Sequence, residues 1–161
     1  MTVAEYNHSV SEYADRLYRF VLKNLRDEAA AQDIIQDTYE KLWKKHEDVT
    51  FSKVKSYLFT AAYHTLIDYT RKKKQQVEIE AIDYMESDNS NGNFDLRASL
   101  DKALSQIPEI QRTVILLRDY EGYNYEEIGE ITGLSESQVK VYIYRGRLAL
   151  RKLIGNPEVL V

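Results

Sequence analysis

The apolar residues between Tyr125 and Leu153 recur with the period of an α-helix. In the second half of this stretch they are spaced by 4, 3, 4 and 3 positions, which places on one helical face Val139, Ile143, Gly146, Leu150 and Leu153. Gly133 and Ser135 interrupt the pattern, and Ile128, Ile131 and Leu134 can pack against that face. The stretch therefore predicts two helices joined by a short turn, with one side of the second helix buried.

Helical patterns also cover most of the remaining chain. There are only six glycines and two prolines, and no segment shows the sustained alternation of a half-buried strand. The predicted fold class is therefore all-α. Start and stop signals place helices at Val3–Leu25, from after Asp27 to about Lys45, from Ser52 to about Lys74, and at Leu96–Gln106, Glu109–Glu121, Tyr125–Thr132 and Glu136–Leu153.

Capping residues support several of these boundaries. Asn124 is followed by Glu127, and Ser135 by Gln138, which is the spacing of a capping box at the start of a helix. Gly133 stands where the preceding helix can end in a left-handed conformation, and Gly122 can end the helix before that one.

One segment, residues 76–95, has the composition of a linker. It holds six acidic residues and no basic one, and its centre consists of Ser, Asp, Asn and Gly. Repulsion between the acids favours an extended chain. We therefore expect two small helical domains, residues 1–75 and 96–161, joined by an acidic flexible linker, with the second domain ending in a helix-turn-helix.

Several functional classes are excluded by composition. The chain has no cysteine, no run long enough to span a membrane and no visible secretory signal, so a cytoplasmic protein without membrane insertion is expected. Its three histidines, His8, His46 and His64, lack the spacing of metal ligands, and no nucleotide-binding loop or nucleophile motif is present. We expect no enzymatic activity, no cofactor and no metal.

The outer face of the last helix is polar and basic. Between Gln138 and Ile154 there are five basic residues and no acidic one, although the whole chain carries a net charge of −4. Opposite the buried stripe lie Ser137, Lys140, Val141, Tyr144, Arg145 and Lys152. A DNA-reading helix requires such a face, but the solvated side of a structural helix has the same composition.

Two faces of the first domain carry candidate contacts. The helix after Asp27 turns Asp33, Gln36, Asp37 and Glu40 outward, as either a docking strip or plain solvent surface. The helix from Ser52 has cations beside aromatic rings on one flank, an arrangement that suits unpaired nucleic acid, although a solvated helix end reads the same way. That flank consists of Lys53, Tyr57, Thr60, His64, Arg71 and Lys72.

Three motifs, in this order, resemble those of bacterial RNA polymerase sigma factors of the extracytoplasmic-function (ECF) class in the sigma-70 family. "AQDIIQDTYEKLW" is similar to the family's A-E-D-[LIV]-[LIV]-Q-[DE]-T-F-x-x-[LA]-W, and "YLFTAAYHTLIDYTRKKK" to its W-L-x-x-I-A-x-N-x-x-x-D-x-x-R-[RK] helix. The run that begins "IPEIQRTVILLRDYEGYNYEEIGEITG" resembles the closing helix-turn-helix. The resemblance covers nearly the whole chain.

The resemblance implies a role for each face. The strip Asp33, Gln36, Asp37 and Glu40 corresponds to the docking surface for a coiled coil of the polymerase's largest subunit, and the second domain would sit on the flap of the second large subunit. The loop Lys45–Ser52 and the flank Lys53, Tyr57, Thr60, His64, Arg71 and Lys72 correspond to the reader of the melted −10 element. The −35 duplex would be read by Ser137, Gln138, Lys140, Val141, Tyr144 and Arg145.

Some positions depart from the family pattern. His64 stands where Asn is usual, and Gln138 and Val141 replace common Thr and Ser, so the promoter sequence does not follow from relatives. An anti-sigma partner is common in the family, but nothing in this sequence identifies one. The alternatives to a sigma factor are a stand-alone helix-turn-helix regulator and a helical adaptor that binds only proteins.

Overall fold

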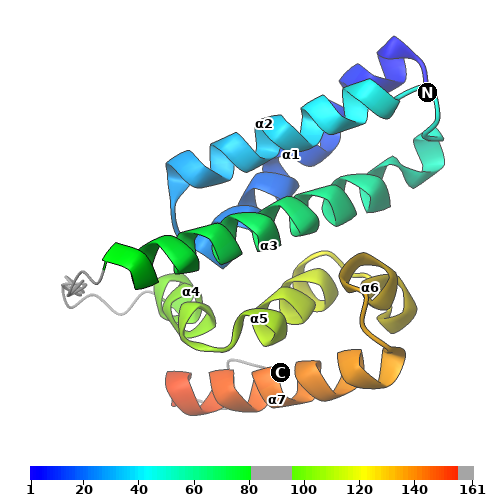
Figure 1. Cartoon of the computed structure of the whole chain (residues 1–161). Helices are drawn as coiled ribbons and strands as arrows, with labels where there is room; N and C mark the ends of the chain where they lie inside the picture. Colours follow the sequence, from blue (N-terminus) through cyan, green and yellow to red (C-terminus); the bar gives the residue numbers. More distant parts are fainter. Residues whose placement is uncertain (81–95, 156–161) are drawn as a thin grey trace.

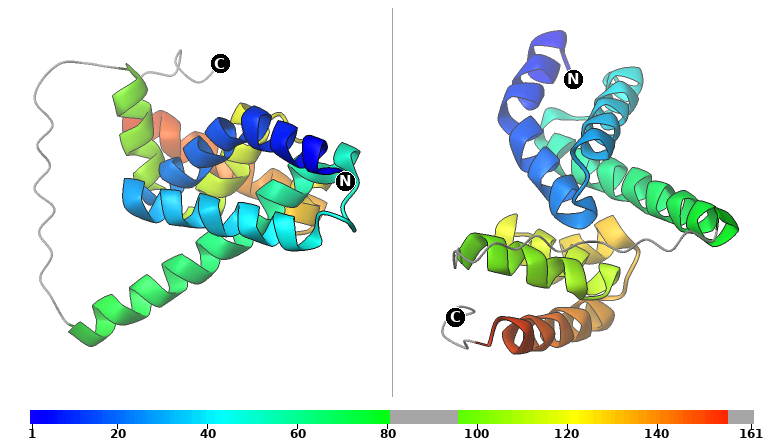
Figure 2. Two further views of the ribbon diagram at one scale, coloured as in Figure 1. Left: turned by 90° about the horizontal axis from the view of Figure 1, so that it is seen from above. Right: turned by 90° about the vertical axis from the view of Figure 1, so that its left-hand side faces the viewer.

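The computed structural model describes residues 1–80 and 96–155, and within them the chain is all-α, as predicted. Figure 1 shows the helices in two groups, α1–α3 on one side and α4–α7 on the other, and both views of Figure 2 show the groups packed together. The first group is α1 (Val3–Leu25), α2 (Glu28–Lys45) and α3 (Val54–Glu80), with a 3₁₀ turn η1 (Phe51–Lys53). The second is α4 (Leu96–Gln106), α5 (Glu109–Ile115), a π-helical turn η2 (Leu116–Tyr120), α6 (Tyr125–Thr132) and α7 (Glu136–Ile154).

Side-chain caps explain where several helices start. The Asp27 carboxylate accepts a hydrogen bond from the Ala30 amide at 3.1 Å, and Asn124 with Glu127 forms a complete capping box. Ser135 with Gln138 forms another at the start of α7. These caps satisfy amide groups that a helix N-terminus otherwise leaves without partners. They confirm the predicted boundaries.

Two helices differ from the prediction. α3 continues to Glu80 instead of ending near Lys74, because the residues that follow Lys74 include good helix formers and no glycine or proline. The predicted helix Glu109–Glu121 changes into the π-helical turn η2 at Leu116, where the Glu121 amide bonds the Leu116 carbonyl at 3.2 Å. Residues 81–95, which hold most of the predicted linker, lie outside the described residues.

The stripe that faces inward on α7 is buried where the spacing predicts. Val139, Ile143, Gly146 and Leu150 are buried, and they pack mainly against α5. Leu153 was predicted on the same stripe but is 49% exposed. Around the helix Leu153 is displaced from Val139 by about 40°, which is no more than the displacement of the buried Ile143, so the spacing alone does not account for its exposure.

The two helical groups are joined by a buried polar contact. Asn24 near the end of α1 is 7% exposed, and its side-chain oxygen accepts hydrogen bonds from Arg112 Nε and Thr113 Oγ1, both at 3.2 Å. Its amide nitrogen donates to the Phe20 carbonyl at 2.9 Å. Because each polar atom of the Asn24 side chain has a partner, its burial carries no unsatisfied group.

A second contact between the groups centres on Glu121, directly after η2. Its side chain is 7% exposed, and its Oε2 lies 3.0 Å from Arg16 Nη2 and 4.0 Å from Lys55 Nζ. Beside it the Tyr123 ring meets Phe59 edge-on at 5.8 Å, and the Lys55 ammonium lies 4.7 Å from the Tyr123 ring centre. The turn η2 thus delivers an acid and a tyrosine to the face of α1 and α3.

Gly146 explains how closely α7 approaches α5. A Cβ at this position would lie 2.4 Å from Ile115 Cδ1 and 3.3 Å from Gln111 Cβ. We expect Gly146→Val to lower the free energy of unfolding by about 1–3 kcal/mol through overpacking. Chemical denaturation followed by circular dichroism measures this. Leu148→Val, at a 37%-exposed position of the same helix, is the control, and equal midpoints for the two variants would contradict the prediction.

We expect the packing of the two groups to depend on pH through the Glu121 carboxyl. Burial raises its pKa above the ordinary value, against the opposing pull of Arg16 and Lys55. A carboxyl with a raised pKa in the folded state contributes stability below its unfolded pKa, and this is lost as pH rises through the folded pKa. Relative to Glu121→Gln, the wild type should therefore gain thermal stability as the pH falls from neutral through the folded-state pKa of Glu121 toward its unfolded-state pKa.

Thermal unfolding over a pH series measures this difference. The exposed Glu130→Gln serves as the matched control and should keep the wild-type pH dependence. If Glu121→Gln and Glu130→Gln show the same profile, burial of Glu121 does not govern the packing.

Candidate nucleic-acid and polymerase interfaces

The N-terminal half of α7 presents one continuous exposed face. Val141 is 42% and Tyr144 is 65% exposed, which is unusual for such large side chains, and neither packs on the core of its own domain. The inward residues of the same turns, Val139 and Ile143, are buried. The structure therefore brings the six predicted −35 residues together, all exposed, on one face: Ser137, Gln138, Lys140, Val141, Tyr144 and Arg145.

Two of these side chains already have partners. Gln138 Oε1 accepts a hydrogen bond from the Ser135 amide at 2.9 Å, so the cap occupies the amide oxygen that a two-bond contact with adenine would need. Lys140 Nζ lies 3.5 Å from Glu136 Oε1 and 5.4 Å from the Tyr125 ring centre. Tyr125 is thus part of the surroundings of this face, although the sequence did not single it out.

The flank of α3 lies on the surface of the first group. Lys53, His64, Arg71 and Lys72 are exposed, while Tyr57 and Thr60 are half-buried. Tyr57 leans on α2, with its hydroxyl 3.5 Å from the Lys41 carbonyl, and the edge of the His64 ring meets Tyr63. The end of α3 projects beyond both groups of helices in Figure 2, so residues 71–76 are exposed.

Aromatic side chains gather before α3, in and beside the loop Lys45–Ser52 that the resemblance assigns to the −10 reader, although the sequence pattern singled out none of them. Trp43 is 43% exposed, and His46 stacks on it with the ring centres 4.4 Å apart and the planes 12° from parallel. Phe51 is 38% exposed and lies against His8 at 5.7 Å. The chain's single tryptophan was the available signal, but its periodicity alone does not show that it is exposed.

The predicted outward strip is on α2, and this helix lies on the side of the molecule far from α7 in Figure 1. Asp33, Gln36 and Glu40 are exposed, and Asp37 is half-buried. Asp37 pairs with Lys41 and Glu40 with Lys44, both at 3.2 Å. Such exposed pairs contribute little to stability, so a basic partner can replace them at small cost.

The α7 face, the α3 flank and the α2 strip are all open surfaces, and none of them resembles an enclosed catalytic site. Within residues 1–80 and 96–155 there is no group of three or more His, Cys, Asp or Glu side chains placed to hold a metal ion. The helices of the same described ranges include none that is both long and apolar enough to cross a membrane.

Comparisons with known proteins match both groups of helices. The sequence model "Sigma-70 region 2" matches residues 10–76, and "Sigma-70, region 4" matches residues 97–150. The ECF RNA polymerase sigma factor SigM of Bacillus subtilis (strain 168) is 30% identical over 150 residues, which span 89% of this chain and 91% of SigM. The sigma factor SigV of the same strain is 28% identical and spans 88% of this chain and 86% of its own.

A solved structure agrees in fold. The sigma factor RpoE from Bartonella quintana, in complex with the anti-sigma factor NepR, superimposes with a TM-score of 0.82 at 26% identity, and the match covers 95% of this chain and 98% of RpoE. The relatives in sequence and the relative in structure lead to one assignment. The chain belongs to the ECF class of the sigma-70 family of RNA polymerase sigma factors.

Proposed function

We propose that this sigma factor reads the −35 duplex with the exposed face of α7 and captures unpaired −10 bases with the flank of α3. The observation that carries the proposal is the division of α7. Each large inward residue from Val139 to Leu150 is buried, while Val141, Tyr144 and Arg145 are exposed. A helix that keeps a valine and a tyrosine on its outer face beside cations suits the major groove, where apolar and charged contacts are both used.

The first domain supplies the single-strand contacts in this proposal. Tyr57 and His64 offer ring faces on which unpaired bases can stack, and Lys53, Arg71 and Lys72 offer charges for the phosphates. The projecting end of α3 is open on its surface, so a strand can follow it. Strand separation would be driven by binding energy alone, and we propose no catalytic residue.

The strip Asp33, Gln36, Asp37 and Glu40 is proposed to dock core polymerase. Its acids carry only weak surface pairs with Lys41 and Lys44, which a basic helical partner could displace. The strip lies on α2, whereas the proposed −10 flank lies on α3, so docking and base capture use different surfaces of one rigid domain. The second domain is proposed to contact the flap of the second large subunit.

We also propose that the packed arrangement of the two domains belongs to an inhibited state. RpoE of Bartonella quintana, which matches this chain over both domains, was solved with an anti-sigma factor bound. In the packed state the α7 face and the α3 flank are held at a fixed separation. An anti-sigma partner that stabilises this packing would keep the two readers from adopting the spacing that a promoter requires.

Run-off transcription tests the main proposal. Core polymerase is combined with this protein on genomic DNA fragments, and discrete promoter-dependent transcripts are expected. A stand-alone helix-turn-helix regulator would bind DNA without supporting initiation, and a protein-only adaptor would do neither. Absence of transcripts from a folded protein that binds core polymerase would refute the promoter-directing role.

Arg145→Ala tests the −35 face. We expect −35 duplex affinity to fall by about 1–3 kcal/mol if the guanidinium contacts a base. Arg151→Ala, which removes the same charge from a more distant turn of α7, should have a smaller effect. Fluorescence anisotropy with duplexes from the mapped promoters provides the measurement. Equal affinities for Arg145→Ala and the wild type would remove Arg145 from the reader.

Asp37→Lys tests the docking strip. The reversed charge should lower the affinity for core polymerase, because it meets the proposed basic partner with a like charge. Binding of promoter DNA by the isolated protein should stay the same. Glu12→Lys makes the same charge change at an exposed position of α1 and is the control. An unaltered core affinity in Asp37→Lys would show that the strip is solvent surface.

A further inference from the structure

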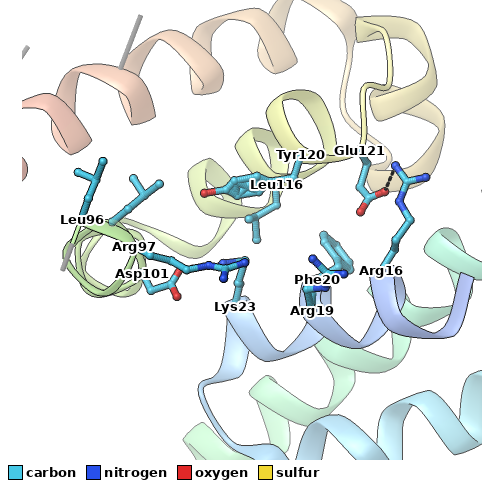
Figure 3. A pocket seen from close by; sticks show the side chains of 11 residues that line it. Arg16, Arg19, Phe20, Lys23, Leu96, Arg97, Asp101, Leu116, Tyr120 and Glu121 are labelled. Atoms are coloured by element: carbon cyan, nitrogen blue, oxygen red, sulfur yellow. Dashed lines mark hydrogen bonds and ion pairs between the residues drawn. The ribbon is translucent and has the colours of Figure 1, made fainter. Parts of the chain in front are cut away.

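A cavity of about 680 Å³ lies between the two domains. Figure 3 shows α1 on one side and α4 with η2 on the other. α1 contributes Phe20 to its wall, α4 contributes Leu100, and η2 contributes Leu116 and Tyr120. The wall of this cavity shares no residue with the α7 face, the α3 flank or the α2 strip.

The wall of the cavity is amphiphilic. Its apolar part is made by Phe20, Leu96, Leu100, Leu116 and Tyr120. Its charged part holds four cations and two carboxylates, which leaves an excess of positive charge: Arg16, Arg19, Lys23, Arg97, Asp101 and Glu121. An apolar pocket with a few convergent polar groups is the usual form of a small-molecule site.

The two arginines on α1 retain capacity for a further anion. Arg16 uses Nη2 toward Glu121, and Arg19 uses Nη2 toward Asp15. A guanidinium carries five N–H donors, so one carboxylate partner leaves donors free for another. Lys23 adds positive charge to the wall, but its ammonium is already engaged. It lies 2.7 Å from Asp101 Oδ1 and 5.2 Å from the Tyr120 ring centre.

The size of the cavity favours a small molecule over a folded peptide. An α-helix about 10 Å across occupies roughly 400 Å³ per turn. The cavity therefore holds fewer than about two turns of helix, whereas sites for drug-sized ligands measure about 300–1,000 Å³. The ligand is expected to be compact, with an apolar body and a negatively charged end.

We propose that this cavity binds a small amphiphilic anion, a hydrocarbon body with a carboxylate or phosphate head, and that the ligand stabilises the packing of the two domains. The apolar body lies against Leu96, Leu100 and Tyr120, and the head meets Arg16 and Arg19. A ligand that contacts both domains binds the packed state more tightly and shifts the population toward it. The effect on transcription rests on the proposed function, but binding itself does not.

Calorimetric titration of the full chain tests the proposal without polymerase or DNA. Decanoate below its micelle concentration should bind with one site per chain. Decanol and decyltrimethylammonium have the same hydrocarbon body with a neutral or a positive head, and each should bind at least ten-fold more weakly. Equal binding of all three would show a plain apolar cleft and overturn the proposal, as would the absence of saturable decanoate binding.

Variants locate the site. Arg19→Gln should weaken decanoate binding several-fold, whereas Arg151→Gln, which removes the same charge from α7, should not change it. Leu100→Trp should abolish binding by filling the cavity. Leu96→Trp provides the same test at a 45%-exposed position on the first turn of α4, where folding tolerates a large side chain. Undiminished decanoate binding in a folded Leu96→Trp protein with intact Arg19 would place the ligand elsewhere.

Two further measurements identify the source of the ligand and its effect. In flotation with phosphatidylglycerol vesicles, co-flotation of the protein assigns the anion to a membrane lipid. Binding of decanoate without co-flotation assigns it to a free amphiphile. Decanoate should raise the thermal midpoint of the wild type and leave that of Leu96→Trp unchanged. Run-off transcription should then fall with decanoate in the wild type only. Absence of transcription from the wild type both with and without decanoate would contradict the proposed function and leave the binding site unaffected.

Discussion

The buried contact of Asn24 with Arg112 and Thr113 determines how the two domains of this sigma factor sit together. Two polar residues of α1 in the described part of the chain are buried, Ser9 and Asn24. Of these, Asn24 forms hydrogen bonds with the second domain. A buried donor or acceptor that loses its partner costs about 1–3 kcal/mol. A packing of α1 on α5 that kept Asn24 and Thr113 buried without this contact would incur that cost, so the contact favours the arrangement observed.

From this arrangement follows the division of surfaces. α1 and α3 use one side to cover the second domain, with Phe59 against Tyr123 and Arg16 and Lys55 around Glu121. The faces proposed for promoter and polymerase, on α2, α3 and α7, remain outside. The interdomain contacts and the proposed binding surfaces therefore do not compete for the same side chains. The packing sets the spacing of the proposed readers without covering them.

The same arrangement creates the cavity. The backbone leaves the regular α-helix at η2, whose residues line the cavity opposite α1. Extra residues in π-helical turns are frequently found at functional sites. Here the turn contributes Leu116 and Tyr120 to the cavity wall and precedes Glu121. One local irregularity thus lies beside both the Glu121 contact with α1 and part of the candidate ligand site.

Much of the local structure was predictable, because it depends on residues within about one helical turn of each other. Asn124 with Glu127 and Ser135 with Gln138 are local hydrogen-bonding pairs, and they start α6 and α7 where the sequence indicates. The exposed face of α7 follows from the same periodicity. Phe59 and Leu66 are buried on α3, which packs against both α1 and α2, so the stripe of one helical face does not identify all of its core residues.

The sequence by itself determined the helices, their caps and the outward faces proposed to contact DNA and polymerase. Only the tertiary structure decided the interdomain contacts and the cavity. The physical reason is the separation of the partners along the chain. Asn24 and Thr113 are 89 residues apart, and Lys23 and Asp101 are 78 apart, so their contacts depend on how whole domains pack and not on the order of neighbouring residues.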